Sequence, residues 1–159
     1  MAAESMNALA ERFAEQGVGS IFLYTNEAHP GENYPHLASM AQKYRHAGAL
    51  RDVYGVTRPI VLDALDGTCH RAYGGMPNMT WIINRGGVPV YKSDWTDANS
   101  IENTLEYLNN VADRRKTGVR LGPFRVERLD YRNADREAFF AGLARNGPKA
   151  VTEFETAWD

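Results

Sequence analysis

The sequence predicts an α/β layer fold, in which helices cover a largely buried sheet. Short apolar runs that suit buried strands alternate with longer segments whose apolar residues recur at helical spacing. The resulting order of elements is α-β-α-β-α-β-β-α. The chain has 159 residues, of which 43% are hydrophobic and 24% are charged, and this is enough for one domain with a substantial core.

The first half of the chain is predicted to contain two helices, two strands and a helical turn. Residues 3–16 place Met6, Leu9 and Phe13 on one face of a helix, and Gly17 ends it. The elements that follow are a strand over 18–25, a helix over 36–54 with Met40, Tyr44 and Ala47 facing inward, a strand over Pro59–Asp63, and a helical turn over 67–73. His46, in the middle of the helix over 36–54, is expected at the surface.

The second half is predicted to begin with a hairpin and continue with a long helix. Thr80–Asn84 and Val88–Lys92 are strands joined by Arg85-Gly86-Gly87, because glycine-containing turns of this length connect hairpins. Asp97 is placed to cap a helix over 98–114, with Ile101 and Leu105 inward.

The C-terminal part differs in character from the rest of the chain. Apolar and charged residues alternate over 124–131 as in a half-exposed strand, a helix follows, and a short amphipathic tail carries Phe154 and Trp158. Gly147-Pro148 should break the helix that runs over 134–145. We therefore divide the chain into a domain over 1–114 and a C-terminal extension over 115–159 that packs on it.

Charge and composition exclude several classes of protein. The net charge of −2 and the lack of a basic stripe argue against nucleic-acid binding. The apolar runs are too short to span a bilayer, and charged residues interrupt any signal-peptide pattern. A single cysteine rules out an internal disulfide. We expect a cytoplasmic protein whose partners include neither nucleic acid nor membrane.

Glu27 and His29 form the most informative pair in the chain. They directly follow the apolar run Ile21–Thr25, so they lie where a strand ends, and ligands of open α/β sheets bind at the carboxyl ends of strands. In an extended chain, side chains two residues apart point to the same face. A carboxylate and an imidazole in such a place predict acid–base chemistry.

Several short motifs occur along the chain in an order that is typical of one protein family. They are Glu27-Ala28-His29-Pro30-Gly31-Glu32, Val61-Leu62-Asp63, Asp66-Gly67-Thr68-Cys69-His70-Arg71-Ala72-Tyr73-Gly74, Pro77-Asn78, Trp81-Ile82-Ile83-Asn84 and Asp94-Trp95-Thr96. Through them the chain resembles the bacterial branch of the iodothyronine deiodinase-like proteins, within the thioredoxin-like superfamily. The resemblance covers residues 6–112, roughly two thirds of the chain.

The resemblance implies a thioredoxin-like sheet with flanking helices and reductive thiol or selenol chemistry on a small molecule. It assigns proton delivery and substrate positioning to Glu27 and His29, and His36 is the nearest match to a further family histidine. A family arginine has no counterpart in Tyr91-Lys92-Ser93-Asp94. The chain begins inside the family's first helix, so we expect the first strand and the cysteine motif to be absent.

A missing central strand would leave backbone groups of the sheet unpaired. Three repairs remain open. The sheet closes up directly, residues 123–131 pair into it, or a second chain contributes. We therefore expect a homo-oligomer or a partner chain that completes the sheet.

The favoured function is an enzyme, related to the redoxins, that acts on a small molecule, with an aromatic one among the candidates. Glu27 and His29 would be catalytic, His36, His70, Trp81 and Trp95 would bind substrate, and no cofactor is expected. One alternative is a non-catalytic ligand- or partner-binding protein of the same fold. Another is a thiol-dependent oxidoreductase using Cys69, although an inert thiol is the commoner role. A weaker alternative is a zinc or copper site formed by His29, His36, Cys69 and His70.

Overall fold

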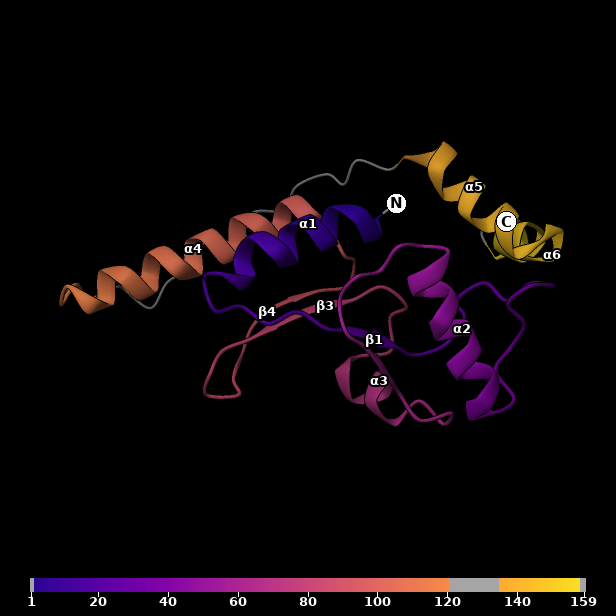
Figure 1. Cartoon of the computed structure of the whole chain (residues 1–159), viewed down its shortest axis with the longest axis horizontal. Helices are drawn as coiled ribbons and strands as arrows, with labels where there is room; N and C mark the ends of the chain where they lie inside the picture. Colours follow the sequence, from indigo (N-terminus) through magenta and orange to yellow (C-terminus); the bar gives the residue numbers. More distant parts are fainter. Residues whose placement is uncertain (1, 121–134, 158–159) are drawn as a thin grey trace. The chain divides into compact units, whose positions relative to one another are not determined.

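The computed structural model describes residues 2–120 and 135–157 (Figure 1). It is a mixed α/β structure, which confirms the predicted class. The elements are α1 (Ala2–Ala14), β1 (Phe22–Tyr24), α2 (Met40–Asp52), β2 (Ile60–Leu62), α3 (Thr68–Tyr73), β3 (Thr80–Ile83), β4 (Pro89–Ser93), α4 (Ala98–Lys116), α5 (Arg136–Asn146) and α6 (Pro148–Thr156).

The chain divides into two compact units. One comprises residues 1–78 and 135–159, and the other comprises residues 79–134. The described strands form one two-stranded sheet in each unit, β1 with β2 and β3 with β4. Residues 123–131, which were predicted to resemble a strand, lie outside the described part of the chain.

The sheet of the first unit is a parallel β-α-β arrangement. β1 and β2 pair in register from Phe22 with Ile60 to Tyr24 with Leu62, and α2 lies between them in the chain. The pairing extends by one bond beyond β2, where the Asp63 amide donates to the Tyr24 carbonyl at 3.0 Å. Because the strands are parallel, both carboxyl ends lie at the same edge of the sheet.

Helix α2 buries a different face from the one predicted. It begins after Ser39, whose side chain accepts a hydrogen bond from the Gln42 amide at 3.2 Å. Lys43, His46 and Ala47 are buried, whereas Tyr44 is 67% exposed. The inward placement of Tyr44, and of Met40, is therefore wrong, and so is the expectation that His46 lies at the surface.

The shift of this face has a physical reason. Lys43 and His46 both find polar partners inside the unit, so their burial does not leave an unsatisfied group. The apolar pattern of α2 is too weak to fix the orientation of the helix by itself, and the buried hydrogen bonds decide it.

Helix α1 follows its predicted pattern. Met6, Leu9 and Phe13 are all buried, which confirms the predicted face. Asn7 is also buried, and its amide nitrogen donates to the Gly55 carbonyl at 2.6 Å. This bond connects α1 to the turn that precedes β2.

Helices α5 and α6 lie side by side (Figure 1) and contact the loop after β1. The side chain of Asn146, at the end of α5, donates to the His29 carbonyl at 2.7 Å and accepts from the Tyr34 amide at 2.7 Å. Gly31 lies so close that a Cβ there would collide with Asn146. The predicted break at Gly147-Pro148 is confirmed, because α6 begins at Pro148.

The hairpin of the second unit was predicted correctly. β3 and β4 pair antiparallel, with a register shift between Ile82 and Ile83. The side-chain oxygen of Asn84 accepts from the amides of Gly86 and Val88 at 2.9 and 3.0 Å. Gly87 has a φ of 78°, a conformation that favours glycine, so the turn depends on its sequence.

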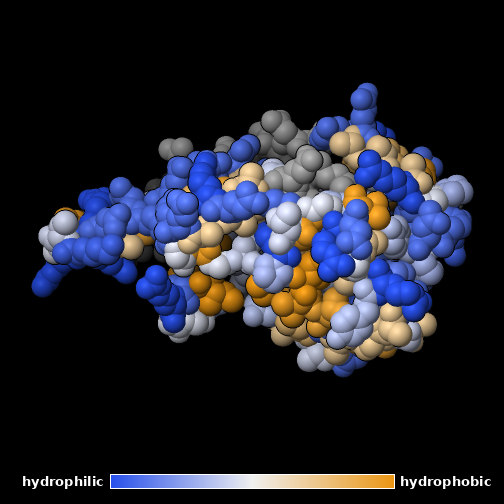
Figure 2. Space-filling view, in the orientation of Figure 1, coloured by the Kyte–Doolittle hydropathy of each residue, from blue (hydrophilic) through white to orange (hydrophobic). Residues whose placement is uncertain are grey.

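Helix α4 confirms its predicted cap and its inward face. The Asp97 carboxylate accepts from the Ser100 amide at 2.8 Å, and Ile101 and Leu105 are buried. The rest of its surface is largely hydrophilic (Figure 2). Within residues 2–120 and 135–157, no helix is long and apolar enough to cross a membrane.

Asn146 should hold the C-terminal helices to the loop, and Asn146→Ala tests this. We expect a loss of about 2 kcal/mol in the free energy of unfolding, because a partly buried carbonyl and a partly buried amide lose their partner. Urea unfolding monitored by circular dichroism measures the loss. The control is Asn33→Ala, which removes an exposed bond to the Arg145 carbonyl at the same contact. Equal losses in the two variants would contradict this role.

Candidate functional site

The candidate site lies at the shared carboxyl edge of β1 and β2. Residues 25–27 leave β1 there and residues 63–67 leave β2. This is the edge at which open α/β sheets bind ligands. Both the acid–base candidate Glu27 and the motif that contains His70 reach it.

A buried lysine joins the two loops at this edge. Lys43 is fully buried, and its Nζ donates to the carbonyl of Thr25 and, at 3.4 Å, to that of Ala64. It also lies 5.6 Å from the ring centroid of Tyr24. Burial lowers the pKa of Lys43, while the carboxylate of Asp63 opposes this shift. The ammonium therefore connects the end of β1 to the end of β2.

Asp63 fixes the segment that follows β2. It is only 4% exposed, and its two oxygens accept from the amides of Cys69 and His70 at 3.0 and 2.8 Å. Burial alone would raise the pKa of Asp63, but the hydrogen bonds from these backbone amides outweigh it and lower that pKa, with help from Lys43. The carboxylate thus determines where α3 begins and where His70 lies.

Glu27 lies in a cluster with Tyr24 and His46. Its Oε1 accepts a hydrogen bond from the Tyr24 hydroxyl and lies 3.1 Å from His46 Nδ1. The Tyr34 ring meets the His46 ring edge-on at 5.3 Å. Burial, followed by the hydrogen bond to Glu27, raises the pKa of Tyr24 well above its ordinary value. The phenol therefore stays protonated at neutral pH and remains a donor.

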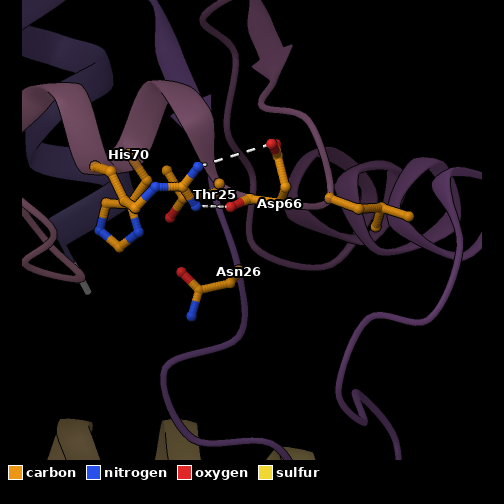
Figure 3. Close-up of a pocket in the computed structure, with 7 residues that line it drawn as sticks. Thr25, Asn26, Asp66 and His70 are labelled. Atoms are coloured by element: carbon orange, nitrogen blue, oxygen red, sulfur yellow. Dashed lines mark hydrogen bonds and ion pairs between the residues drawn. The ribbon is translucent and has the colours of Figure 1, made fainter.

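A small open pocket is lined by residues that follow β1 and β2 and by residues of α3 (Figure 3). Its volume is about 220 Å³. The guanidinium of Arg71 lies at the pocket and donates to the backbone carbonyl of Asp66. His70 Nε2 lies 2.9 Å from the Met76 carbonyl. The lining residues are Thr25, Asn26, Leu65, Asp66, Gly67, His70 and Arg71.

His29 does not join Glu27, so the predicted pairing of these two side chains is wrong. The ring of His29 packs against Phe154 and Phe139, with centroids 5.2 and 6.3 Å apart. The same-face rule holds only for an extended backbone, and the chain bends at residues 28–29. The histidine that meets Glu27 is His46, which is 19 residues away in the chain.

The other predicted residues are dispersed. His70 lines the pocket, whereas His36 is exposed in the loop before α2. Trp81 in β3 and Trp95 after β4 belong to the second unit. Cys69 is half-buried.

The predicted metal ligands do not assemble. In the part of the chain that the structure describes, no three histidine, cysteine, aspartate or glutamate side chains lie close enough to hold a metal ion. His29, His36, Cys69 and His70 are all described, and the structure does not bring them together as a zinc or copper site. His29 and His36 lie in the segment between β1 and α2, whereas Cys69 and His70 lie in α3.

Sequence reasoning missed Lys43, His46 and Tyr24. One signal was available, because Lys43, His46 and Ala47 have the spacing of one helical face. A lysine and a histidine on that face look like solvated residues until the polar ends of β1 and β2 are placed beneath them.

Comparisons of the chain with protein-family models, with curated proteins and with solved structures found no match. The resemblance to the deiodinase-like proteins therefore stays a prediction. The geometry at the edge of β1 and β2 carries the functional argument.

Asp63 should make the stability of the protein depend on acid pH. Its pKa is lower in the folded state than the value of about 3.9 for an unfolded chain. The unfolded state then binds more protons in acid, so the stabilisation is complete above that value and is lost as the pH falls through the folded pKa. We expect the free energy of unfolding to decline below about pH 4.

Asp63→Asn should weaken this decline and cost about 2 kcal/mol at pH 7, because the charged acceptor of two partly buried amides is lost. Urea unfolding at a series of pH values measures both effects. The matched control is Asp52→Asn, since Asp52 forms an exposed ion pair with Arg51. A profile for Asp63→Asn that coincides with the Asp52→Asn profile would argue against the assignment.

Proposed function

We propose that this protein is a thioredoxin-like enzyme of the deiodinase-like family that transfers protons to and from a small molecule, with Glu27 as the general base. The observation that carries the proposal is the orientation of the Glu27 carboxylate. Both of its polar neighbours, Tyr24 and His46, meet the same oxygen, Oε1. Among the described residues, Oε2 has no hydrogen-bond partner.

The two oxygens can therefore have different tasks. A carboxylate only accepts, so Tyr24 donates its hydroxyl proton and His46 donates from Nδ1. These bonds fix the carboxyl group, and the side chain of Glu27 remains 21% exposed. Oε2 is then the atom that takes a proton from a substrate, while Tyr24 and His46 are positioning residues.

Acid–base chemistry suits the residues better than reduction does. Reductive chemistry of the deiodinase type needs a thiolate nucleophile. Reactive cysteines occupy electropositive sites, whereas the backbone amide of Cys69 donates to the buried carboxylate of Asp63. Proton transfer needs only the carboxylate and its fixed donors, all of which are at the edge of the first sheet.

The family assignment and the assembly state belong to the same proposal. The parallel β-α-β arrangement followed by a hairpin and a helix is the order that the resemblance implies, and this supports a thioredoxin-like fold. Each described sheet has only two strands, so its edges are open to a further strand. We retain the prediction of a homo-oligomer or of a partner chain that completes the sheet.

A non-catalytic ligand-binding protein is the second candidate. The pocket of Figure 3 has its own polar lining and includes Thr25 and Asn26, which immediately precede Glu27. A binding protein would use this pocket without any proton transfer by Glu27. Turnover therefore separates the two candidates.

Glu27→Gln should lower the rate of proton transfer by roughly 10²-fold, the usual contribution of a general base. The assay incubates the full chain in D₂O with a panel of small aromatic ketones and aromatic keto acids and follows deuterium uptake at the acidic carbon by NMR. His46→Gln should lower the rate less, because it disturbs the orientation of the base and leaves the base in place. The melting temperature of each variant is measured in parallel.

Two control variants make the result decisive. Cys69→Ser should retain the fold and the rate, because the thiol has no part in the proton transfer. His29→Ala should retain the rate and lower the melting temperature, because its ring packs against Phe139 and Phe154. A rate that is lost in His29→Ala and kept in His46→Gln would return the acid–base role to His29. An unchanged rate in Glu27→Gln would leave the binding protein ahead.

A further inference from the structure

We infer that the pocket at the ends of β1 and β2 binds a small monocarboxylate with an apolar body, and that Arg71 is the residue that receives the carboxylate. This deepens the proposed function, since it names a substrate class for the same edge of the sheet. The inference rests on the proposed function in one respect: it assumes that the molecule bound in the pocket is the substrate of Glu27.

The size of the pocket limits the ligand. Its volume of about 220 Å³ is below the usual range for drug-sized ligands. A pocket of this size suits a small molecule such as a single substituted ring. Leu65, which is 45% exposed, supplies an apolar part of the lining.

Arg71 supplies the permanent positive charge of the lining. One of its amino groups donates to the backbone carbonyl of Asp66, which holds the guanidinium at the pocket (Figure 3). Its other contact, to the Asp66 carboxylate, measures 3.7 Å and is too long for a hydrogen bond. A guanidinium has five N–H donors in a planar fork that matches a carboxylate. Arg71 therefore keeps donors for a ligand.

The remaining polar groups favour a monoanion over a phosphate. The Asp66 carboxylate already accepts from the Thr68 hydroxyl at 2.8 Å, and its charge lies close to Arg71. His70 Nε2 faces a carbonyl and must carry its hydrogen, so a neutral ring presents Nδ1 as an acceptor. A multiply charged anion would be repelled by the Asp66 carboxylate and by the lone pair of His70 Nδ1. A monocarboxylate needs only the guanidinium of Arg71. Asn26 is an exposed residue of the lining, and its side-chain amide donates to the Glu27 carbonyl at 3.3 Å (Figure 3).

Titration of the full chain with benzoate, benzamide and inorganic phosphate tests the inference. Two-dimensional ¹H–¹⁵N NMR reports on the Arg71 Nε–H and on the side-chain amide of Asn26. We expect benzoate to bind saturably and to shift both signals, and benzamide and phosphate to bind at least tenfold more weakly. Equal binding of benzoate and benzamide, or tighter binding of phosphate, would overturn the inference.

Three variants locate the interaction. Arg71→Ala should weaken benzoate binding at least tenfold, because a charge-assisted bidentate contact is lost. Arg51→Ala is the matched control, since Arg51 is an exposed arginine that is paired with Asp52 and lies outside the pocket, and it should not change the affinity. Asp66→Asn should tighten binding, because it removes a competing charge and keeps the backbone carbonyl that holds Arg71.

The result is independent of catalysis. Glu27→Gln should still bind benzoate saturably, even where its proton transfer is lost. If benzoate binding depends on Arg71 but Glu27→Gln does not change turnover, the carboxylate site is supported and the proposed enzyme is refuted. Undiminished binding in Arg71→Ala would refute the site and leave the test of Glu27 unaffected.

Discussion

The ammonium group of Lys43 is the contact on which the site depends. It is a charge without access to water, and the carbonyls of Thr25 and Ala64 replace its hydration. Those carbonyls belong to the segments that leave β1 and β2, so the need to solvate one charge brings two loops to fixed positions. A short parallel pair of strands cannot do this alone, because its backbone bonds end at Asp63. The polar interior of this unit thus organises its edge as much as the apolar core does.

Helix α2 links the burial of Lys43 to the position of the Glu27 carboxylate. Lys43 and His46 lie three residues apart and therefore on one face, so an orientation that buries the lysine also brings the histidine to Glu27. The carboxylate is then held by donors from two elements, β1 and α2. Such a group is pre-organised, since its geometry does not depend on the loop alone. The deviation of α2 from its apolar pattern and the assembly of the Glu27 cluster have the same cause.

The sequence predicted the local elements of this fold well and its long-range polar contacts poorly. The cap at Asp97, the hairpin turn with Gly87 and the buried face of α1 follow from rules that act over a few residues. His46 was misplaced because the reason for its burial, the Glu27 carboxylate, lies 19 residues away. The predicted pairing of Glu27 with His29 was wrong because the prediction assumed an extended chain, whereas the backbone bends at residues 28–29. The position of Glu27 at the end of a strand needed only the strand itself and was predicted.

The contact made by Asn146 has a consequence for synthesis on the ribosome. The loop that carries Glu27 forms hydrogen bonds with Asn146, which follows His29 by 117 positions. Translation delivers β1, α2 and β2 first, and the partner of this loop emerges only once α5 has been synthesised. A nascent chain that has completed the first sheet therefore still lacks the contact that fixes its acid–base loop. The loop reaches its final form only after translation has passed α5.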